Sequence, residues 1–301
     1  MRTLIAAFAA VVFSTPLAAQ LRVVTSTTDL ADIAKAVGGS HVRVSHVSEG
    51  YQDPHFAEAK PSFVLQLRNA DVFAFVGLDL EAGWMPVLLQ GARNPKVSAG
   101  GRGHVDVSQA IEVLDRARGN VDRSQGDVHA LGNPHYWLDP DNGRRIAQLF
   151  QRKFSELDAR NATAYAANAS AFETRLKAAE EGWRGQLAEI KGKPVVAYHT
   201  SWKYLAEYTG LKIVGFMEPK PGVPPSPSHI ASLIAEMKRT GAKAIIMEPY
   251  YSRKDADFVA ARTGAKVLVL APSVGALRGA KLDSYIDVLK HDIAQIAATV
   301  K

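Results

Sequence analysis

Cysteine is absent from the 301-residue sequence. We therefore expect no disulfide, no thiolate metal site, no cysteine nucleophile and no lipid attached to an N-terminal cysteine. The excess of one charge sign is also small, because 36 basic and 30 acidic side chains give a formal net charge of +6 at pH 7. Since the basic residues are spread along the chain without a basic run, we expect no nucleic-acid partner.

Long apolar runs are scarce, and the one that stands out lies at the N-terminus. Met1-Arg2 supplies a positive start, Thr3 to Ser14 is almost continuously apolar, and Leu17-Ala18-Ala19 offers a small residue for cleavage before Gln20. This layout is typical of a secretory signal peptide over residues 1–19, and the run is shorter than the about 20 residues that a membrane-spanning helix needs. We therefore expect a protein that is exported to the periplasm and, without cysteine, is not lipid-anchored there.

The rest of the chain is ordinary in composition, with 47% hydrophobic and 22% charged residues, and its length predicts two domains. One order of elements occurs twice. A strand, a polar segment and a helix begin at Leu21 and again at Pro194; a helix that starts with Pro-Ser leads to strands at 71–76 and at 243–247; third strands follow at Lys96-Val97 and at 266–270. Strands that alternate with helices favour parallel sheets with helical cover. The predicted fold class is α/β, with two pseudo-symmetric lobes.

Two stretches between these repeats have a helical composition, at 142–157 and 162–190. The second is rich in good helix formers and would make a helix about 45 Å long, which suits a rigid spine along both lobes. We predict an N-terminal lobe at 20–158, a linking spine helix at 159–192 and a C-terminal lobe at 193–301. The polar segment from Arg116 to Leu131 predicts a mobile surface loop.

Three histidines occupy similar places in this pattern. His55 follows the second predicted strand, His135 lies in a turn that enters the helices between the lobes, and His199 follows the first strand of the C-terminal lobe. Ligands of open parallel sheets bind beyond the carboxyl ends of the strands, which places a shared site in the cleft between the lobes. Imidazole suits Zn²⁺, and three histidines leave one tetrahedral position for a carboxylate or water. The wide spacings alone, however, favour three separate surface or capping histidines.

Short motifs surround these histidines in a specific order. They are Pro54-His55-Phe56, Lys60-Pro61-Ser62, Asn69-Ala70-Asp71, the run NPHYWLDP at 133–140 and the run YHTSW at 198–202. Together they resemble the solute-binding proteins of zinc and manganese ABC importers, and the resemblance extends from Val23 to about Ile296. It implies two α/β lobes that are joined by one long helix, with the metal between the lobes.

The resemblance also implies His55, His135 and His199 as the first three metal ligands. Family members with histidine at the third position mostly bind zinc, whereas manganese binders commonly have a carboxylate there. Ligand chemistry agrees, because three imidazoles favour Zn²⁺ over Mn²⁺. We therefore expect Zn(II) as the bound solute and Mn(II) as the less favoured alternative.

The chain departs from the family at the fourth ligand. The family usually has an aspartate after the third strand of the second lobe, but this sequence reads Leu270-Ala271-Pro272-Ser273, without a carboxylate. Glu248 follows a neighbouring strand, and we predict it either as the fourth ligand or as a hydrogen-bond partner of a ligand imidazole. Glu218 and Asp53 are weaker candidates, and a water molecule could also complete the tetrahedron. His129, in the predicted loop, could capture incoming metal.

The expected function is that of a periplasmic carrier that binds one Zn²⁺ and delivers it to an inner-membrane ABC permease. We expect a monomer that catalyses no reaction. Three other functions remain open: a zinc hydrolase with an activated water at the open position, a binding protein for an organic solute, and an adhesin. No histidine has a general base nearby in the sequence, and the histidine set argues against an organic solute.

Overall fold

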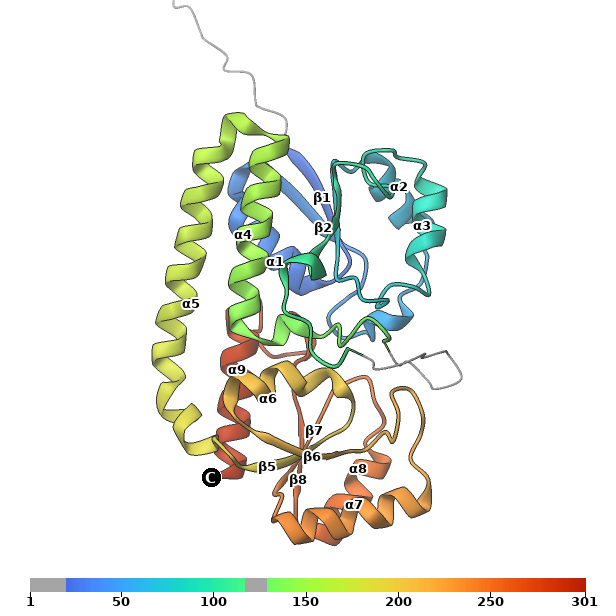
Figure 1. The fold of residues 1–301 in the computed structure, drawn as a ribbon, viewed down its shortest axis with the longest axis vertical. Helices are drawn as coiled ribbons and strands as arrows, with labels where there is room; N and C mark the ends of the chain where they lie inside the picture. Colours follow the sequence, from blue (N-terminus) through green and yellow to red (C-terminus); the bar gives the residue numbers. More distant parts are fainter. Residues whose placement is uncertain (1–19, 117–128) are drawn as a thin grey trace, which may run out of the picture.

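The computed structural model describes residues 20–116 and 129–301 (Figure 1). The predicted signal peptide, residues 1–19, and residues 117–128 of the predicted surface loop lie outside the described residues. Within the described ranges, no helix combines the length and the apolar character that crossing a membrane requires.

The first half of the chain forms a four-stranded parallel sheet in the order β2-β1-β3-β4. Its strands are β1 (Leu21–Thr25), β2 (Val42–His46), β3 (Val72–Phe75) and β4 (His104–Asp106), and its helices are α1 (Thr28–Gly38), α2 (Pro61–Asn69) and α3 (Met85–Ala92). Successive side chains of a strand point to opposite faces. Val23 therefore packs in the same core as α1, whereas Val24 packs in a separate core with α2 and α3.

The strand predicted at Lys96-Val97 is wrong, because this segment forms a turn and the edge strand is β4. The Asn94 side-chain amide donates hydrogen bonds to the carbonyls of Leu67 and Ala70, at 2.8 Å each, and anchors the turn below α2. Val97 is apolar because it fills the core under α2 and α3. An apolar residue that is buried in a turn gives the same sequence pattern as one that is buried in a strand, which explains the wrong prediction.

The second half repeats this arrangement, with the strand order β6-β5-β7-β8. The strands are β5 (Pro194–Ala197), β6 (Lys212–Phe216), β7 (Ala244–Met247) and β8 (Lys266–Val269), and the helices are α6 (Lys203–Thr209), α7 (Pro227–Thr240), α8 (Lys254–Thr263) and α9 (Tyr285–Val300). Each strand has its counterpart in the same place in the first sheet. The predicted α/β fold class with two parallel sheets is confirmed.

Two helices connect the sheets, α4 (Pro140–Leu157) and α5 (Ala162–Ile190). Helix α5 spans 29 residues, about 44 Å at 1.5 Å per residue, and runs beside both sheets (Figure 1). One hydrophobic core continues from the inner face of the first sheet, through Phe172 and Trp183 of α5, to the inner face of the second sheet. The two halves are therefore joined by packing as well as by the chain.

Short 3₁₀ turns form the loops at the junction of the halves. They are η2 (Pro54–Phe56), η5 (Tyr136–Leu138) and η7 (Thr200–Trp202). Each contains or directly follows one of the three histidines, so the positions of the imidazoles depend on these turns.

Candidate metal centre

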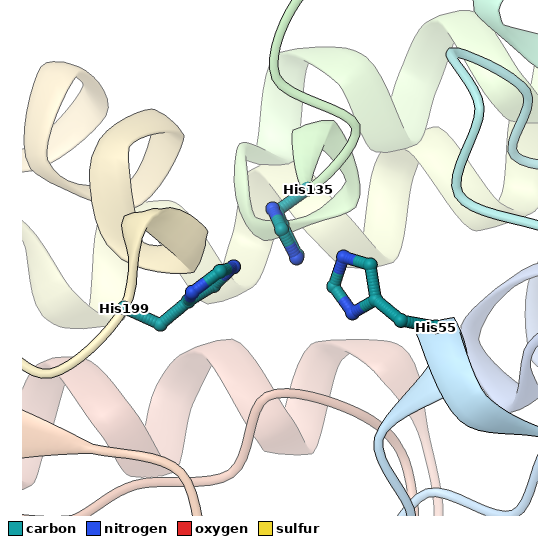
Figure 2. A group of neighbouring side chains, drawn as sticks. All are labelled: His55, His135 and His199. Atoms are coloured by element: carbon teal, nitrogen blue, oxygen red, sulfur yellow. The ribbon is translucent and has the colours of Figure 1, made fainter. Parts of the chain in front are cut away.

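The structure brings His55, His135 and His199 together from three separate segments (Figure 2). One ring nitrogen of each lies within 4.8 Å of the other two, and the ring centroids are 5.3 to 5.7 Å apart. His135 is 1% and His199 2% exposed, and the His55 side chain is 8% exposed. Three buried imidazoles that share one space are not surface or capping groups, so the alternative favoured by spacing alone is wrong.

His55 is held by Asp53 and by its own turn. The Asp53 carboxylate caps η2 by accepting the backbone N–H of His55 at 3.0 Å, and its Oδ1 lies 2.6 Å from His55 Nδ1. The Trp84 indole donates a hydrogen bond to the carbonyl of Pro54 at 3.0 Å. Both the ring and the backbone of His55 are thereby fixed.

His135 is held in the same way by Asn133. The side-chain oxygen of Asn133 accepts the backbone N–H of His135 and lies 3.0 Å from its Nδ1. The amide nitrogen of Asn133 donates to the carbonyl of Thr200 at 2.9 Å, which ties this loop to the turn after His199. Sequence reasoning assigns no role to Asn133. The repeated motif Asx-Pro-His, at 53–55 and at 133–135, could have indicated that Asn133 holds His135 as Asp53 holds His55.

His199 is held by Glu218, whose Oε2 lies 2.7 Å from His199 Nδ1. The same oxygen accepts the backbone N–H of Gly222 at 3.1 Å. Glu218 and Asp53, the weaker predicted ligands, thus each contact the Nδ1 of one histidine of the group. An oxygen partner on Nδ1 fixes the tautomer and leaves the Nε2 lone pair for a metal.

The three histidine nitrogens lie close enough together for one cation to bind all of them. The buried Nε2 of His135 has no hydrogen-bond partner, although buried polar atoms are nearly always paired. Zn–N bonds of about 2.0–2.1 Å place tetrahedral nitrogens roughly 3.4 Å apart. One ring nitrogen of each histidine lies within 4.8 Å of the other two, so binding zinc would draw these nitrogens together by up to about 1.4 Å.

The charges around the histidines favour a bound cation. Burial, together with the charges of His199 and His55, lowers the pKa of His135 well below its ordinary value, so this ring is neutral. Burial also acts to lower the pKa of His199, but the hydrogen bond with Glu218 and the negative charge of Glu248 outweigh it and raise the pKa. Burial acts to raise the pKa of Asp53, yet its hydrogen bond with His55 leaves it below the ordinary value, so Asp53 is ionised.

Glu248 follows β7 and is fully buried, and neither carboxylate oxygen has a hydrogen-bond partner. Burial raises its pKa to about 7, against the opposing influence of the His199 charge. Among the described residues, the group within 4.8 Å contains the three histidines but not Glu248. Its role as fourth ligand therefore stays a prediction.

His129 also lies beside the group. Its Nε2 is 3.1 Å from His55 Nε2, and the two ring centroids are 5.2 Å apart. Burial, followed by the charges of His55 and His199, lowers the pKa of His129 to about 3, so its ring is neutral too. A neutral imidazole this close offers a second possible source for a fourth ligand.

The segment that lacks the expected aspartate packs against the first half of the chain. Val274 N–H donates to Asp29 Oδ1 at 3.1 Å, and its carbonyl accepts the Thr28 hydroxyl at 2.9 Å. The carbonyl of Pro272 accepts the Trp137 indole N–H at 2.8 Å. Backbone groups of this segment therefore bond to α1 and to the loop that contains His135.

The two-sheet fold and the buried group of three histidines are the features expected of a metal-binding component of an ABC importer. The chain belongs to the family described as ZnuA, zinc-uptake complex component A, periplasmic, whose model matches residues 23–299. The resemblance inferred from the motifs is confirmed. The protein is accordingly a solute-binding protein that acts outside the cytoplasm and delivers metal to a membrane permease, and it is not an enzyme.

Similar proteins carry names with different metals. The manganese-binding lipoprotein MntA of Halalkalibacterium halodurans is 27% identical, over 91% of this chain and 86% of its own length. The zinc-binding protein AdcA of Streptococcus pyogenes serotype M6 is 25% identical, over 85% of this chain and 51% of its own length. A crystal structure of ZnuA superposes with a TM-score of 0.77 at 25% identity, covering 94% of this chain and 100% of the other.

Proposed function

We propose that this protein binds Zn²⁺ through His55, His135 and His199 and delivers it to an inner-membrane ABC permease. One observation carries the choice of metal: each Nδ1 lies against a side-chain oxygen, which leaves three Nε2 atoms as ligands. Nitrogen donors bind Zn²⁺ more tightly than Mn²⁺ in the Irving–Williams order, and Mn²⁺ suits oxygen donors better.

The second candidate is Mn²⁺ as the transported ion, which the name of the relative MntA suggests. A manganese site would need more oxygen ligands than three imidazoles leave room for in a tetrahedron. Glu248 is the one carboxylate that we propose as a direct ligand. The number of oxygen ligands therefore separates the two candidates.

We further propose that Glu248 supplies the fourth ligand. Burying a carboxylate without a hydrogen-bond partner is unfavourable, and a divalent cation beside it would offset that cost. His129 is the competing donor, because its 3.1 Å separation from His55 Nε2 is close to the roughly 3.4 Å between nitrogens around tetrahedral zinc. A water molecule would complete the site if neither side chain binds.

The way in which the halves are joined favours one route for release of the metal. We propose lobes at 20–158 and 193–301 with a linking helix at 159–192. The continuous core along α5 opposes a wide opening of the lobes. Loosening of the loops that hold the histidines is therefore the favoured route of transfer.

We propose a monomer that is free in the periplasm after removal of residues 1–19. The relative MntA is named a lipoprotein, so the expectation of an unanchored protein rests only on the lack of cysteine in this sequence. Palmitate labelling of the expressed full-length chain, followed by cell fractionation, tests this point.

The metal assignment is tested by the content of protein purified without added metal, followed by a crystal structure with anomalous scattering at the zinc edge. We expect about one zinc per chain and an anomalous peak among the three imidazoles. A chain that contains mainly manganese, or a zinc peak away from the histidines, would overturn the proposal.

A further inference from the structure

Glu81 is a buried carboxylate that is separate from the histidine group. It is 1% exposed, and burial raises its pKa to about 7. Its two oxygens accept backbone N–H groups, Oε1 from Val76 at 2.8 Å and Oε2 from Gly77 at 3.0 Å. One side chain therefore binds two successive peptide groups at the end of β3.

The turn that follows is strained. Gly77, Leu78 and Asp79 have φ values of +80°, +54° and +66°. Glycine adopts this left-handed region freely, but residues with a Cβ do so only at a cost in free energy. A run of three such residues, two of them not glycine, persists only when surrounding contacts hold it. The carboxylate of Glu81 provides contacts of this kind.

The turn joins segments that contain two of the three histidines. The Val76 carbonyl accepts the hydroxyl of Tyr136, the residue after His135, at 2.7 Å. The Glu81 carbonyl accepts the backbone N–H of Trp84 at 3.2 Å.

Trp84 in turn contacts the segment that contains His55. Its indole donates to the carbonyl of Pro54, the residue before His55, at 3.0 Å. The segments of His55 and His135 thus both attach within a few residues of the Glu81 carboxylate.

We propose that Glu81 is a positioning residue of the metal site, which sets the separation of the His55 and His135 imidazoles by holding the turn at 76–79. This inference rests on the proposed function, since it takes the histidines as metal ligands. Glu81 touches no ligand ring. Its effect passes through Val76 to Tyr136 on one side and through Trp84 to Pro54 on the other.

The test compares Glu81→Gln with Asp158→Asn. Both replace a buried, hydrogen-bonded carboxylate by the amide of the same shape. Asp158 accepts hydrogen bonds from Tyr165 and Asn161 at the far end of α4, about 27 Å along the helix from the His135 loop. It therefore controls for loss of stability without contact with the site.

Zinc affinity is measured by competition with a chelator, and site geometry by the visible absorption of the Co²⁺-loaded protein. We expect Glu81→Gln to weaken Zn²⁺ binding about 10–100-fold, as for other residues that orient ligands, and to alter the Co²⁺ spectrum. Asp158→Asn should leave both unchanged. Unchanged affinity and spectrum in Glu81→Gln, or equal losses in the two variants, would overturn the proposal.

A rescue keeps the test decisive if Glu81→Gln is poorly folded. Asp79 is exposed, and Asp79→Gly removes one of the two unfavourable left-handed residues. We expect the double variant Glu81→Gln/Asp79→Gly to recover part of the folding and part of the lost affinity. Recovery of folding with no recovery of affinity contradicts the inference. If the unaltered protein itself binds no divalent cation, the proposed function fails. If it binds zinc and Glu81→Gln binds zinc equally well, only the role of Glu81 is refuted.

Discussion

Replacement of Glu248 by glutamine should make the metal-free protein more stable at alkaline pH. The carboxyl is fully buried without a hydrogen-bond partner, and burial raises its pKa from 4.5 to about 7. Folding therefore disfavours the ionised form. The penalty is absent below the unfolded-state pKa, grows as pH rises from about 4.5 to about 7, and is complete above that.

The size of this effect follows from the two pKa values. At about 1.4 kcal/mol per pH unit, the difference between 4.5 and about 7 makes the ionised carboxyl cost roughly 3 kcal/mol of folding free energy at pH 8. The neutral amide of Glu248→Gln avoids most of that cost. Urea unfolding of the metal-free proteins at pH 5 and pH 8 measures the gain, which should be about 2–3 kcal/mol at pH 8 and less than about 1 kcal/mol at pH 5.

Other buried carboxyls, including Asp29 with a pKa raised to about 7 by burial, change both proteins equally and cancel in this comparison. The exposed Glu207 gives a control, because Glu207→Gln removes the same charge from the surface. Equal pH dependence in the unaltered protein and Glu248→Gln would refute the reasoning. Zinc should reverse the order of stability of the two proteins. If the carboxylate binds the ion, the unaltered protein gains more stability from Zn²⁺ than Glu248→Gln does.

Three further predictions concern the ligands. Zinc affinity should fall steeply between about pH 7 and pH 5, with more than one proton taken up for each ion released. Protons should displace zinc from His199 first, because the pKa of His199 is raised. A pH-independent zinc affinity, measured by chelator competition, would contradict a histidine site. Asn133→Ala should weaken zinc binding about 10–100-fold by freeing the His135 ring, and unchanged affinity would show that the ring needs no support. His129→Ala should change the affinity less than about threefold if Glu248 closes the site; a loss as large as that of His199→Ala would instead make His129 the fourth ligand.

The fold was largely predictable because its signals are local. Three local signals predicted it: apolar strands that alternate with helices, Pro-Ser at helix starts, and the helix-forming composition of 162–190. Helix α5 begins and ends where the sequence indicated. The strand at Val97 was predicted wrongly, because an apolar residue is needed at a buried position in a turn just as it is in a strand. The edge strand β4 is only three residues long and has a weak pattern.

The histidine group was predictable only through the family motifs, since no local spacing joins His55, His135 and His199. Some of the residues that hold the histidines are close to them in the sequence, and others are distant. The Asx side chain of each Asx-Pro-His motif holds a histidine two residues away, and both copies of the motif can be found in the sequence. Glu218, which follows β6, contacts His199, which follows the neighbouring strand β5. Glu81 acts through a strained turn. Such contacts depend on how the halves pack, so the sequence alone could not assign them.

Competition titration of the metal-free protein with Zn²⁺ and Mn²⁺ tests the central claim most directly, because the claim is that three imidazoles choose the metal. The same chelator assay is run on His55→Ala, His135→Ala and His199→Ala as an internal scale. We expect Zn²⁺ to bind more tightly than Mn²⁺ by several orders of magnitude, and each histidine variant to lose most of that preference. Comparable affinities for the two ions, or a preference that survives in all three variants, would contradict a zinc carrier built on this histidine group.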